Sequence, residues 1–222
     1  MKMNSETLSV LKNFSAINQN LMIKEGNTLT TMSAMKNIVA KAEVSESFER
    51  EVAIYDLNEF LASLSLFKSP VLEFDESFVT IKEENTTTFL KYFYSDPSVV
   101  TTPSKTIKMP SKEVTFSLKG EDLTKLKRAA GVIGAPDLVL ERKDTGSFLT
   151  VKDKKNDTAN TFSLDVTTTS EGNFNCFFTV ENLKVMDGNY DVEISSKNIS
   201  HLSSSNKDVE YWVALEPEST YE

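Results

Sequence analysis

The sequence predicts an α+β protein built from two similar halves, each with two short helices and an antiparallel β-sheet. Three observations predict this class: a helical pattern that occurs twice, alternating polar and apolar segments over most of the remaining chain, and a proline-containing connector between the halves. The 222 residues suffice for two domains of roughly 110 residues each. With 39% hydrophobic and 26% charged residues, the composition is that of a globular protein.

The first helix is expected over residues 5–14, where apolar residues recur at the spacing of one helix face. Residues 120–130 repeat this design in the second half, and Leu123 takes the place of Leu8. The two segments agree in their apolar stripe and in the lysine that follows it. This correspondence indicates an internal duplication.

A second short helix is expected in each half after a β-like run. In the first half, Asp56 is expected to cap the helix that contains residues 57–61. In the second half, Thr179 is the expected cap of a helix that reaches Met186, and residues 187–189 form the turn that ends it. The order of strand and helix is therefore the same in both halves.

The rest of the sequence is typical of strands and hairpins. Turn signals at residues 25–27, 145–147 and 171–173 separate the alternating segments. Residues 95–110 contain prolines and have neither a helical nor a strand period, which predicts an extended connector. We therefore expect an N-terminal domain of residues 1–107, with the connector beginning at about residue 95, and a C-terminal domain of residues 108–222.

Several classes of protein are excluded. No apolar run is long enough to span a membrane, and the N-terminus lacks the apolar core of a signal peptide. The single cysteine, Cys176, excludes an internal disulfide and fits a reducing cytoplasm. The single histidine, His201, lies in a polar run that we expect to be a loop, and motifs for metal, phosphate or nucleophile sites are missing. We therefore expect a cytoplasmic protein that is not an enzyme and that needs no metal or cofactor.

The basic residues are distributed unevenly. The net charge of −9 argues against nucleic-acid binding over the whole surface. Residues 2–14 and 119–128 nevertheless carry more basic than acidic residues, whereas the whole chain has 24 Lys and Arg against 33 Asp and Glu. On a helical wheel, Lys12 and Arg128 fall opposite the apolar stripes of their helices. This pattern favours a localised positive surface, although solvated lysines on polar helix faces are the alternative.

Several segments resemble the sliding clamps of T-even-type bacteriophages. The segments, in the order of that family, are residues 11–14, 52–61, 96–98, 121–123, 188–190 and 213–220. The resemblance covers nearly the whole chain and is weaker at residues 27–48, 68–90 and 141–160. It implies a two-domain processivity fold that assembles head to tail as a homotrimer, with the antiparallel sheets outside and two short helices per domain facing the ring centre.

The resemblance also implies a function. The ring is expected to encircle duplex DNA without reading its sequence and to tether the replicative DNA polymerase in the cytoplasm of the host cell. The residues expected to face the DNA are Lys2, Lys12, Lys119, Lys125, Lys127, Arg128 and Lys184. The alternative is a β-rich structural or assembly protein of a virion that does not act on DNA.

Two further surfaces are implied by the resemblance. A pocket beside the connector is expected to bind peptides of the polymerase, the clamp loader and late-transcription factors, unless its residues only pack the core and the loop. The expected lining residues are Val99, Val100, Pro103, Ile107, Met109, Trp212, Val213 and Leu215. The subunit interface is expected to join two edge strands of neighbouring copies. The expected residues are Phe89, Tyr92 and Phe93 on one strand and Thr161, Phe162 and Leu164 on the other.

Overall fold

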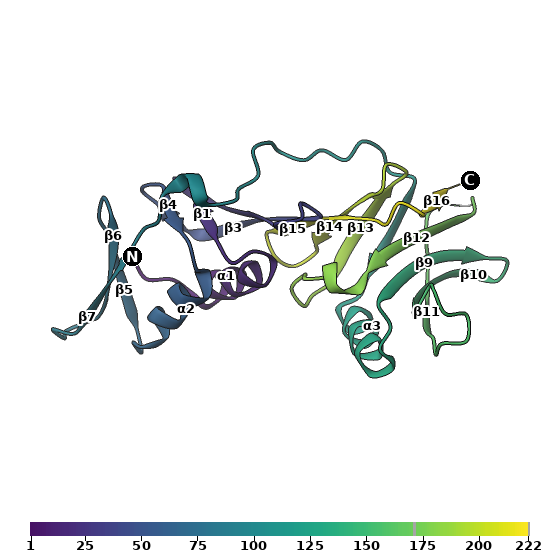
Figure 1. Ribbon diagram of the computed structural model, residues 1–222, viewed down its shortest axis with the longest axis horizontal. Coiled ribbons are helices and arrows are strands. Elements are labelled where there is room, and N and C mark those ends of the chain that lie inside the picture. Colours follow the sequence, from purple (N-terminus) through teal and green to yellow (C-terminus); the bar gives the residue numbers. More distant parts are fainter. Residues whose placement is uncertain (171, 222) are drawn as a thin grey trace. The chain divides into compact units, whose positions relative to one another are not determined.

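The computed structural model describes residues 1–170 and 172–221 (Figure 1). The chain divides into two compact units, Met1–Lys105 and Thr106–Glu222. The expected turn at residues 171–173 includes Glu171, which lies outside the described residues. Each unit combines antiparallel strands with α-helix, as the sequence predicts.

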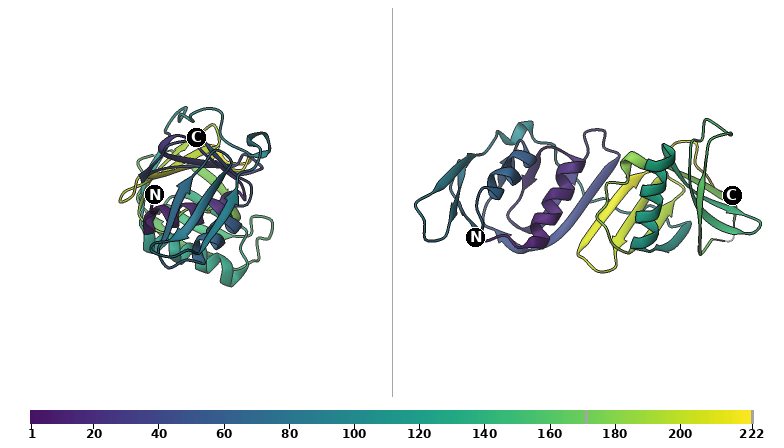
Figure 2. Two further views of the ribbon diagram at one scale, coloured as in Figure 1. Left: turned by 90° about the vertical axis from the view of Figure 1, so that its left-hand side faces the viewer. Right: turned by 90° about the horizontal axis from the view of Figure 1, so that it is seen from below.

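The N-terminal unit contains two α-helices and two groups of strands. The helices are α1 (Ser5–Ile17) and α2 (Leu57–Ser65), and a 3-10 helix, η1 (Pro97–Val99), follows the last strand. The strands are β1 (Leu21–Ile23), β2 (Gly26–Met32), β3 (Ile38–Phe48), β4 (Val52–Ile54), β5 (Pro70–Phe74), β6 (Phe78–Glu83) and β7 (Phe89–Phe93). They pair antiparallel in the orders β4-β1-β2-β3 and β5-β6-β7. The two helices lie side by side (Figure 2, right).

Local sequence explains why these two helices begin where they do. The Asn4 side chain caps α1 by accepting a hydrogen bond from the Thr7 backbone N–H at 2.7 Å. The Asp56 side chain caps α2 and accepts from the Glu59 N–H at 3.1 Å, which confirms the predicted cap. Phe14, fully buried, anchors α1 in the core, and α1 contacts β2 and β3. The helix ends are therefore hydrogen-bonded and one helix face is buried.

The C-terminal unit contains one α-helix among its described residues, α3 (Gly120–Ile133), and a 3-10 helix, η2 (Val180–Asn182). The strands are β8 (Val114–Leu118), β9 (Asp137–Lys143), β10 (Gly146–Lys152), β11 (Phe162–Val166), β12 (Phe174–Thr179), β13 (Tyr190–Ser195), β14 (Ile199–Ser204), β15 (Val209–Ala214) and β16 (Thr220–Tyr221). They pair antiparallel in the orders β15-β14-β13-β8 and β11-β10-β9-β12-β16. Helix α3 packs against β10 and β11.

The predicted helix from Thr179 to Met186 is wrong. Only η2 forms there, and Thr179 makes no side-chain cap within the described residues. Tertiary contacts bind the backbone that follows: the Met186 N–H donates to the Tyr211 hydroxyl at 3.2 Å, and the Lys127 ammonium donates to the Val185 carbonyl at 3.0 Å. Because these groups are bonded to other elements, the segment does not need a helical ladder.

A close backbone contact fixes the start of α3. A Cβ on Gly120 would lie 2.9 Å from the carbonyl oxygen of Gly188, which cannot move aside as a flexible side chain could. We expect Gly120→Ala to lower the free energy of unfolding by about 1–3 kcal/mol. The control is Gly131→Ala in the same helix, where a Cβ meets no atom within 4 Å, and this change should raise stability by about 0.5–1 kcal/mol. Urea unfolding measures both, and equal effects would contradict the steric explanation.

Candidate nucleic-acid interface

The solvent face of α1 carries Lys12. The neighbouring Leu11 and Phe14 are both fully buried, so the helix turns Lys12 toward solvent. Within residues 1–170 and 172–221, Lys12 forms no ion pair. Its charge is therefore available to a ligand on the exposed side of the helix.

The solvent face of α3 carries two more basic residues. Arg128 is exposed and has no acidic partner in the described part of the chain, whereas the Lys125 ammonium lies 3.5 Å from an Asp122 carboxylate oxygen. Asp122 lies in the first helical turn, where the helix dipole favours a negative charge. Lys119, at the N-cap position, is also exposed. Residues 119–128 therefore present three accessible cations in one unit.

Lys127 does not have the solvent-facing ammonium group that the expected DNA-facing role requires. It is half-buried, and its ammonium group donates to the Val185 carbonyl. Burial lowers the pKa of Lys127, while the nearby Asp187 carboxylate acts in the opposite direction. The ammonium group therefore supports the irregular segment after η2 and does not point to solvent.

The remaining two expected cations differ from Lys12 and Arg128, because Lys2 is exposed but ion-paired and Lys184 is half-buried. The Lys2 ammonium lies 2.6 Å from a Glu84 carboxylate oxygen, so its charge is already offset within the N-terminal unit. Lys184 is half-buried in the segment that follows η2. Of the seven residues expected to face DNA, Lys12, Lys119 and Arg128 are thus exposed without an ion pair among the described residues, and Lys2 and Lys125 are exposed but ion-paired.

Part of the expected peptide pocket belongs to hydrophobic cores. Val100 is buried with Met22 and Ala53 in the N-terminal unit, and Val213 is fully buried in β15 of the C-terminal unit. The burial of these two residues fits the alternative stated above, in which they only pack the core and do not line a peptide pocket. In the N-terminal unit, Val99 is 52% exposed and Pro103 is half-buried.

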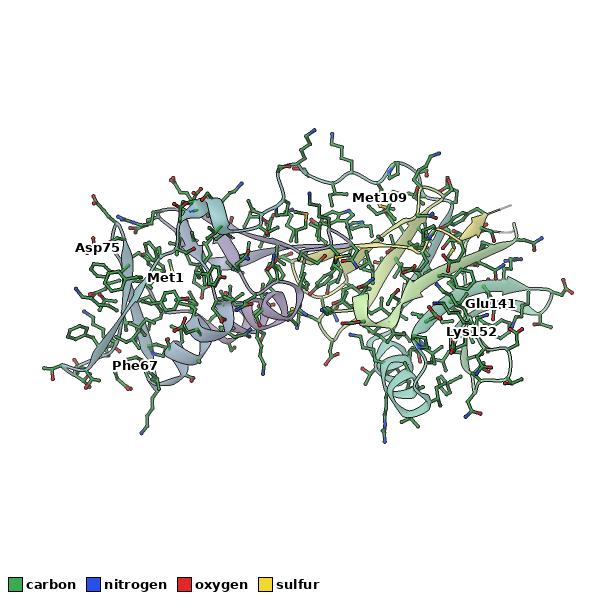
Figure 3. The ribbon with its side chains drawn as sticks, in the orientation of Figure 1. Met1, Phe67, Asp75, Met109, Glu141 and Lys152 are labelled. Carbon is green, nitrogen blue, oxygen red and sulfur yellow. The ribbon has the colours of Figure 1, made fainter. Side chains whose placement is uncertain are left out.

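The C-terminal unit contains the other four expected pocket residues. Ile107 and Met109 are half-buried, and Met109 lies on the extended segment before β8 (Figure 3). Leu215 and Trp212 are buried, and the Trp212 ring stacks on His201 with the centroids 4.9 Å apart. His201 therefore lies in β14 and not in the expected loop.

The expected interface residues other than Thr161 belong to strands at sheet edges. Among the described residues, β7 pairs only with β6 and β11 pairs only with β10. Phe89 and Phe93 are 59% and 65% exposed. Tyr92 differs from them because its ring packs edge-on against Phe60 of α2, with the centroids 5.2 Å apart. Both strands therefore offer free backbone hydrogen-bonding groups on one side.

The same expectation includes the β11 residues. Phe162 and Leu164 are half-buried, and Thr161 is exposed just before the strand. Leu164 lines a groove of about 680 Å³ that runs between β8 and β11 and that also includes Phe116 and Lys119. A second groove, of about 390 Å³, lies between α2 and β7 and includes Tyr92.

Sequence reasoning did not identify the role of Glu46. Glu46 is buried and accepts hydrogen bonds from the Asn4 N–H at 2.5 Å and from the Thr7 hydroxyl at the start of α1. Burial alone would raise the pKa of Glu46, but the hydrogen bonds from Thr7, Asn4 and Ser45 outweigh it, and the pKa is lowered. Glu46 thus fixes the N-terminus of the helix that carries Lys12.

A signal for this role exists in the sequence. Along β3, every second residue from Ala42 to Phe48 is buried, and Glu46 occupies one of these positions. A carboxylate in the buried phase of a strand needs hydrogen-bond partners. The alternating pattern of β3 could therefore have identified Glu46 as a buried carboxylate with hydrogen-bond partners.

Comparisons with known proteins agree on one family. The family model described as DNA polymerase processivity factor matches residues 2–101, and the model described as the C-terminal part of the gp45 sliding clamp matches residues 115–217. The sliding clamp of Vibrio phage KVP40 is 32% identical, with 97% of this chain and 99% of the relative covered. The sliding clamp of Enterobacteria phage T4 is 30% identical, and both chains are covered completely.

Solved structures share the fold. A complex of A. fulgidus PCNA with the C-terminal region of FEN-1 matches with a TM-score of 0.71 and 16% identity, over 99% of this chain and 98% of that chain. PCNA from Thermococcus kodakaraensis matches with a TM-score of 0.71 and 16% identity, over 97% and 99%. These matches confirm the predicted fold class. Among the described residues, none of the helices has the length and apolar character that a membrane-spanning segment needs.

Proposed function

Because the chain belongs to the sliding-clamp family of DNA polymerase processivity factors, we propose that three copies close into a ring around duplex DNA and hold the replicative polymerase on its template. The chain is a processivity factor and not an enzyme. The proposal adds the closed homotrimer, the encirclement of DNA and the residues that face it.

The position of the basic residues carries this proposal. The chain has a formal net charge of −9, yet Lys12 and Arg128 are exposed on the corresponding helices of the two halves. An acidic protein that repels DNA over most of its surface would thereby attract it along these helices. Lys119 and Lys125 add to the positive charge beside Arg128.

The mechanism is topological. A protein that holds DNA only through phosphate contacts loses affinity steeply as the salt concentration rises. A closed ring cannot leave the duplex sideways, so a few weak contacts suffice to centre the DNA. The same weak contacts let the ring slide, and none of them needs to read a base.

The ring closes head to tail through the two edge strands. In this arrangement β7 of one copy continues the sheet that ends at β11 of the next copy. The free backbone groups of both strands and the exposed rings of Phe89 and Phe93 support this interface. The interface gives hydrogen-bond partners to backbone groups of β7 and β11 that could otherwise pair with unrelated chains.

Partner proteins of the clamp bind through short hydrophobic peptides in the host cytoplasm. These partners are the polymerase, the clamp loader and late-transcription factors. Within the C-terminal unit, the peptide dock contains Ile107 and Met109 beside the connector and Trp212 from β15. The support is the apolar character of these three residues and the partial exposure of the first two.

Charge reversal on the two helices tests the DNA-facing surface. We expect the double variant Lys12→Glu with Arg128→Glu to lower polymerase processivity at least about tenfold, because six attractive positions in the ring become repulsive. Native mass spectrometry should still detect the trimer, since neither side chain lies on β7 or β11. Primer extension with the cognate polymerase and loader measures the length of the products.

A matched control has the same change in net charge. Lys24→Glu with Lys197→Glu alters one exposed lysine in each unit, away from α1 and α3. This control should keep processivity within about twofold of the wild type. Wild-type product length in the Lys12→Glu, Arg128→Glu variant would remove the DNA-facing role of the two helices.

A further inference from the structure

We infer that Lys91 of one copy pairs with Asp165 of the next copy and thereby fixes the register in which the two edge strands join. The inference rests on the proposed ring and specifies its interface. It is carried by the orientation of the side chains along β7 and β11 and by their complementary charges.

The side chains of β7 alternate between two faces. Tyr92 points toward the core side, where its ring packs against Phe60 of α2. Lys91 and Phe93 point to the opposite face and meet Phe78 there: the Lys91 ammonium lies 4.2 Å from the Phe78 ring centroid, and the rings of Phe78 and Phe93 lie 5.5 Å apart. Lys91 is exposed and forms no ion pair with the described residues.

The side chains of β11 alternate in the same way. Leu164 is paired with Leu149 on the core side, which α3 covers. Asp165 is paired with Phe148 on the opposite face, is exposed, and lacks a basic partner in the described part of the chain. Ser163 shares this face, and its hydroxyl lies 2.9 Å from the Thr150 hydroxyl.

The two core sides must coincide when the strands join. Helix α2 contacts β7 and helix α3 contacts β11, so a continuous sheet keeps both helices on one side. In the proposed interface β7 and β11 join antiparallel, like the strand pairs within each unit. Directly opposite residues of an antiparallel pair project to the same face. Lys91 must therefore face an odd-numbered residue of β11, because residues 163 and 165 share its face.

Two registers place the same length of β7 opposite β11. In one register, Lys91 faces Asp165, Tyr92 faces Leu164 and Phe93 faces Ser163. In the other register, Lys91 faces Ser163 and Asp165 faces the ring of Phe89. Both registers pair side chains of the core side, but only the first pairs opposite charges, whereas the second leaves the carboxylate against an aromatic ring without a cation. Since opposite charges stabilise a cross-strand pair, the first register is selected.

A charge exchange tests this pair. Lys91→Glu or Asp165→Lys alone should weaken assembly about fivefold at each interface, because a like-charge pair replaces an attractive one. The double variant with both changes should recover most of the wild-type assembly. Sedimentation over a range of concentrations measures the trimer, and Lys108→Glu and Asp157→Lys, which alter exposed loop residues, should leave it unchanged.

Cysteine pairs then identify the register directly. Oxidation of Lys91→Cys with Asp165→Cys should cross-link the subunits faster than oxidation of Lys91→Cys with Ser163→Cys, since only directly opposite residues bring their Cβ atoms within disulfide reach. Cys176 is fully buried and does not compete. Faster cross-linking of the Ser163 variant, or no recovery in the charge exchange, overturns this register while the ring stands. A wild-type protein that stays monomeric overturns the ring itself.

Discussion

Leu11→Ala is expected to lower the free energy of unfolding by about 2–5 kcal/mol, one of the two largest effects expected for this chain. Leu11 is fully buried between α1 and the strands that the helix covers. Removing its side chain leaves a cavity that the surrounding core fills only in part. Because the next residue is Lys12, the loss also loosens the helix that carries a proposed DNA contact.

An identical substitution on the surface provides the control. Leu66 follows α2 and is 71% exposed, so Leu66→Ala should change the free energy of unfolding by less than about 0.5 kcal/mol. Urea unfolding followed by circular dichroism measures both variants. Equal losses would mean that the α1 contacts do not stabilise the N-terminal unit as described.

Glu46→Gln is the other change with a large expected effect, a loss of about 2 kcal/mol at neutral pH. The carboxylate of Glu46 accepts hydrogen bonds from the Asn4 N–H and the Thr7 hydroxyl, and both hold the start of α1. An amide accepts with only one of its two groups and carries no charge, so these bonds weaken. The Thr7 hydroxyl, which is buried, loses its charged partner.

The pH dependence of this effect follows from the lowered pKa of Glu46. Because the folded-state pKa lies below the ordinary value of 4.5, the ionised carboxylate favours the folded state. Its contribution is complete well above pH 4.5 and disappears as the pH falls from there through the folded-state pKa. The difference between the wild type and Glu46→Gln should therefore be largest at neutral pH and shrink in acid.

The control for this measurement is Glu43→Gln on the same strand. Glu43 is exposed and its carboxylate lies 3.8 Å from the Lys41 ammonium. An exposed ion pair of this kind contributes little to the free energy of unfolding. Its unfolding curve should follow that of the wild type within about 0.5 kcal/mol at each pH. A Glu46→Gln difference that does not change with pH would contradict the assignment to the ionised carboxylate.

Local signals in the sequence predicted the three α-helices of the described residues, and tertiary contacts explain why the predicted helix after Thr179 does not form. Asp56 caps α2 as expected, because an N-cap needs only a side chain and the next turn of backbone. The segment after Thr179 has comparable local signals, but its backbone is bound by Tyr211 and Lys127, which are distant in sequence. Such contacts leave no periodic trace in the segment itself.

For the candidate site too, the sequence predicted the position of some residues and not of others. The helical wheel places Lys12 and Arg128 on exposed faces, and the structure has them there. The wheel gives only the direction of the Cβ, so it could not predict that the long Lys127 side chain turns back to the Val185 carbonyl. Val213 lies in the buried phase of its strand, which composition alone does not reveal.

In the proposed ring, β7 and β11, the two strands that join neighbouring copies, are different, and this difference governs what a defective copy would do. A copy with a blocked β7 would still offer β11 to a normal neighbour, and it would then have no second side to which another copy can add. Such a copy acts as a chain terminator. A minority of terminators in a mixed population would trap normal copies in open arcs, so damage to one edge would be dominant over the intact protein.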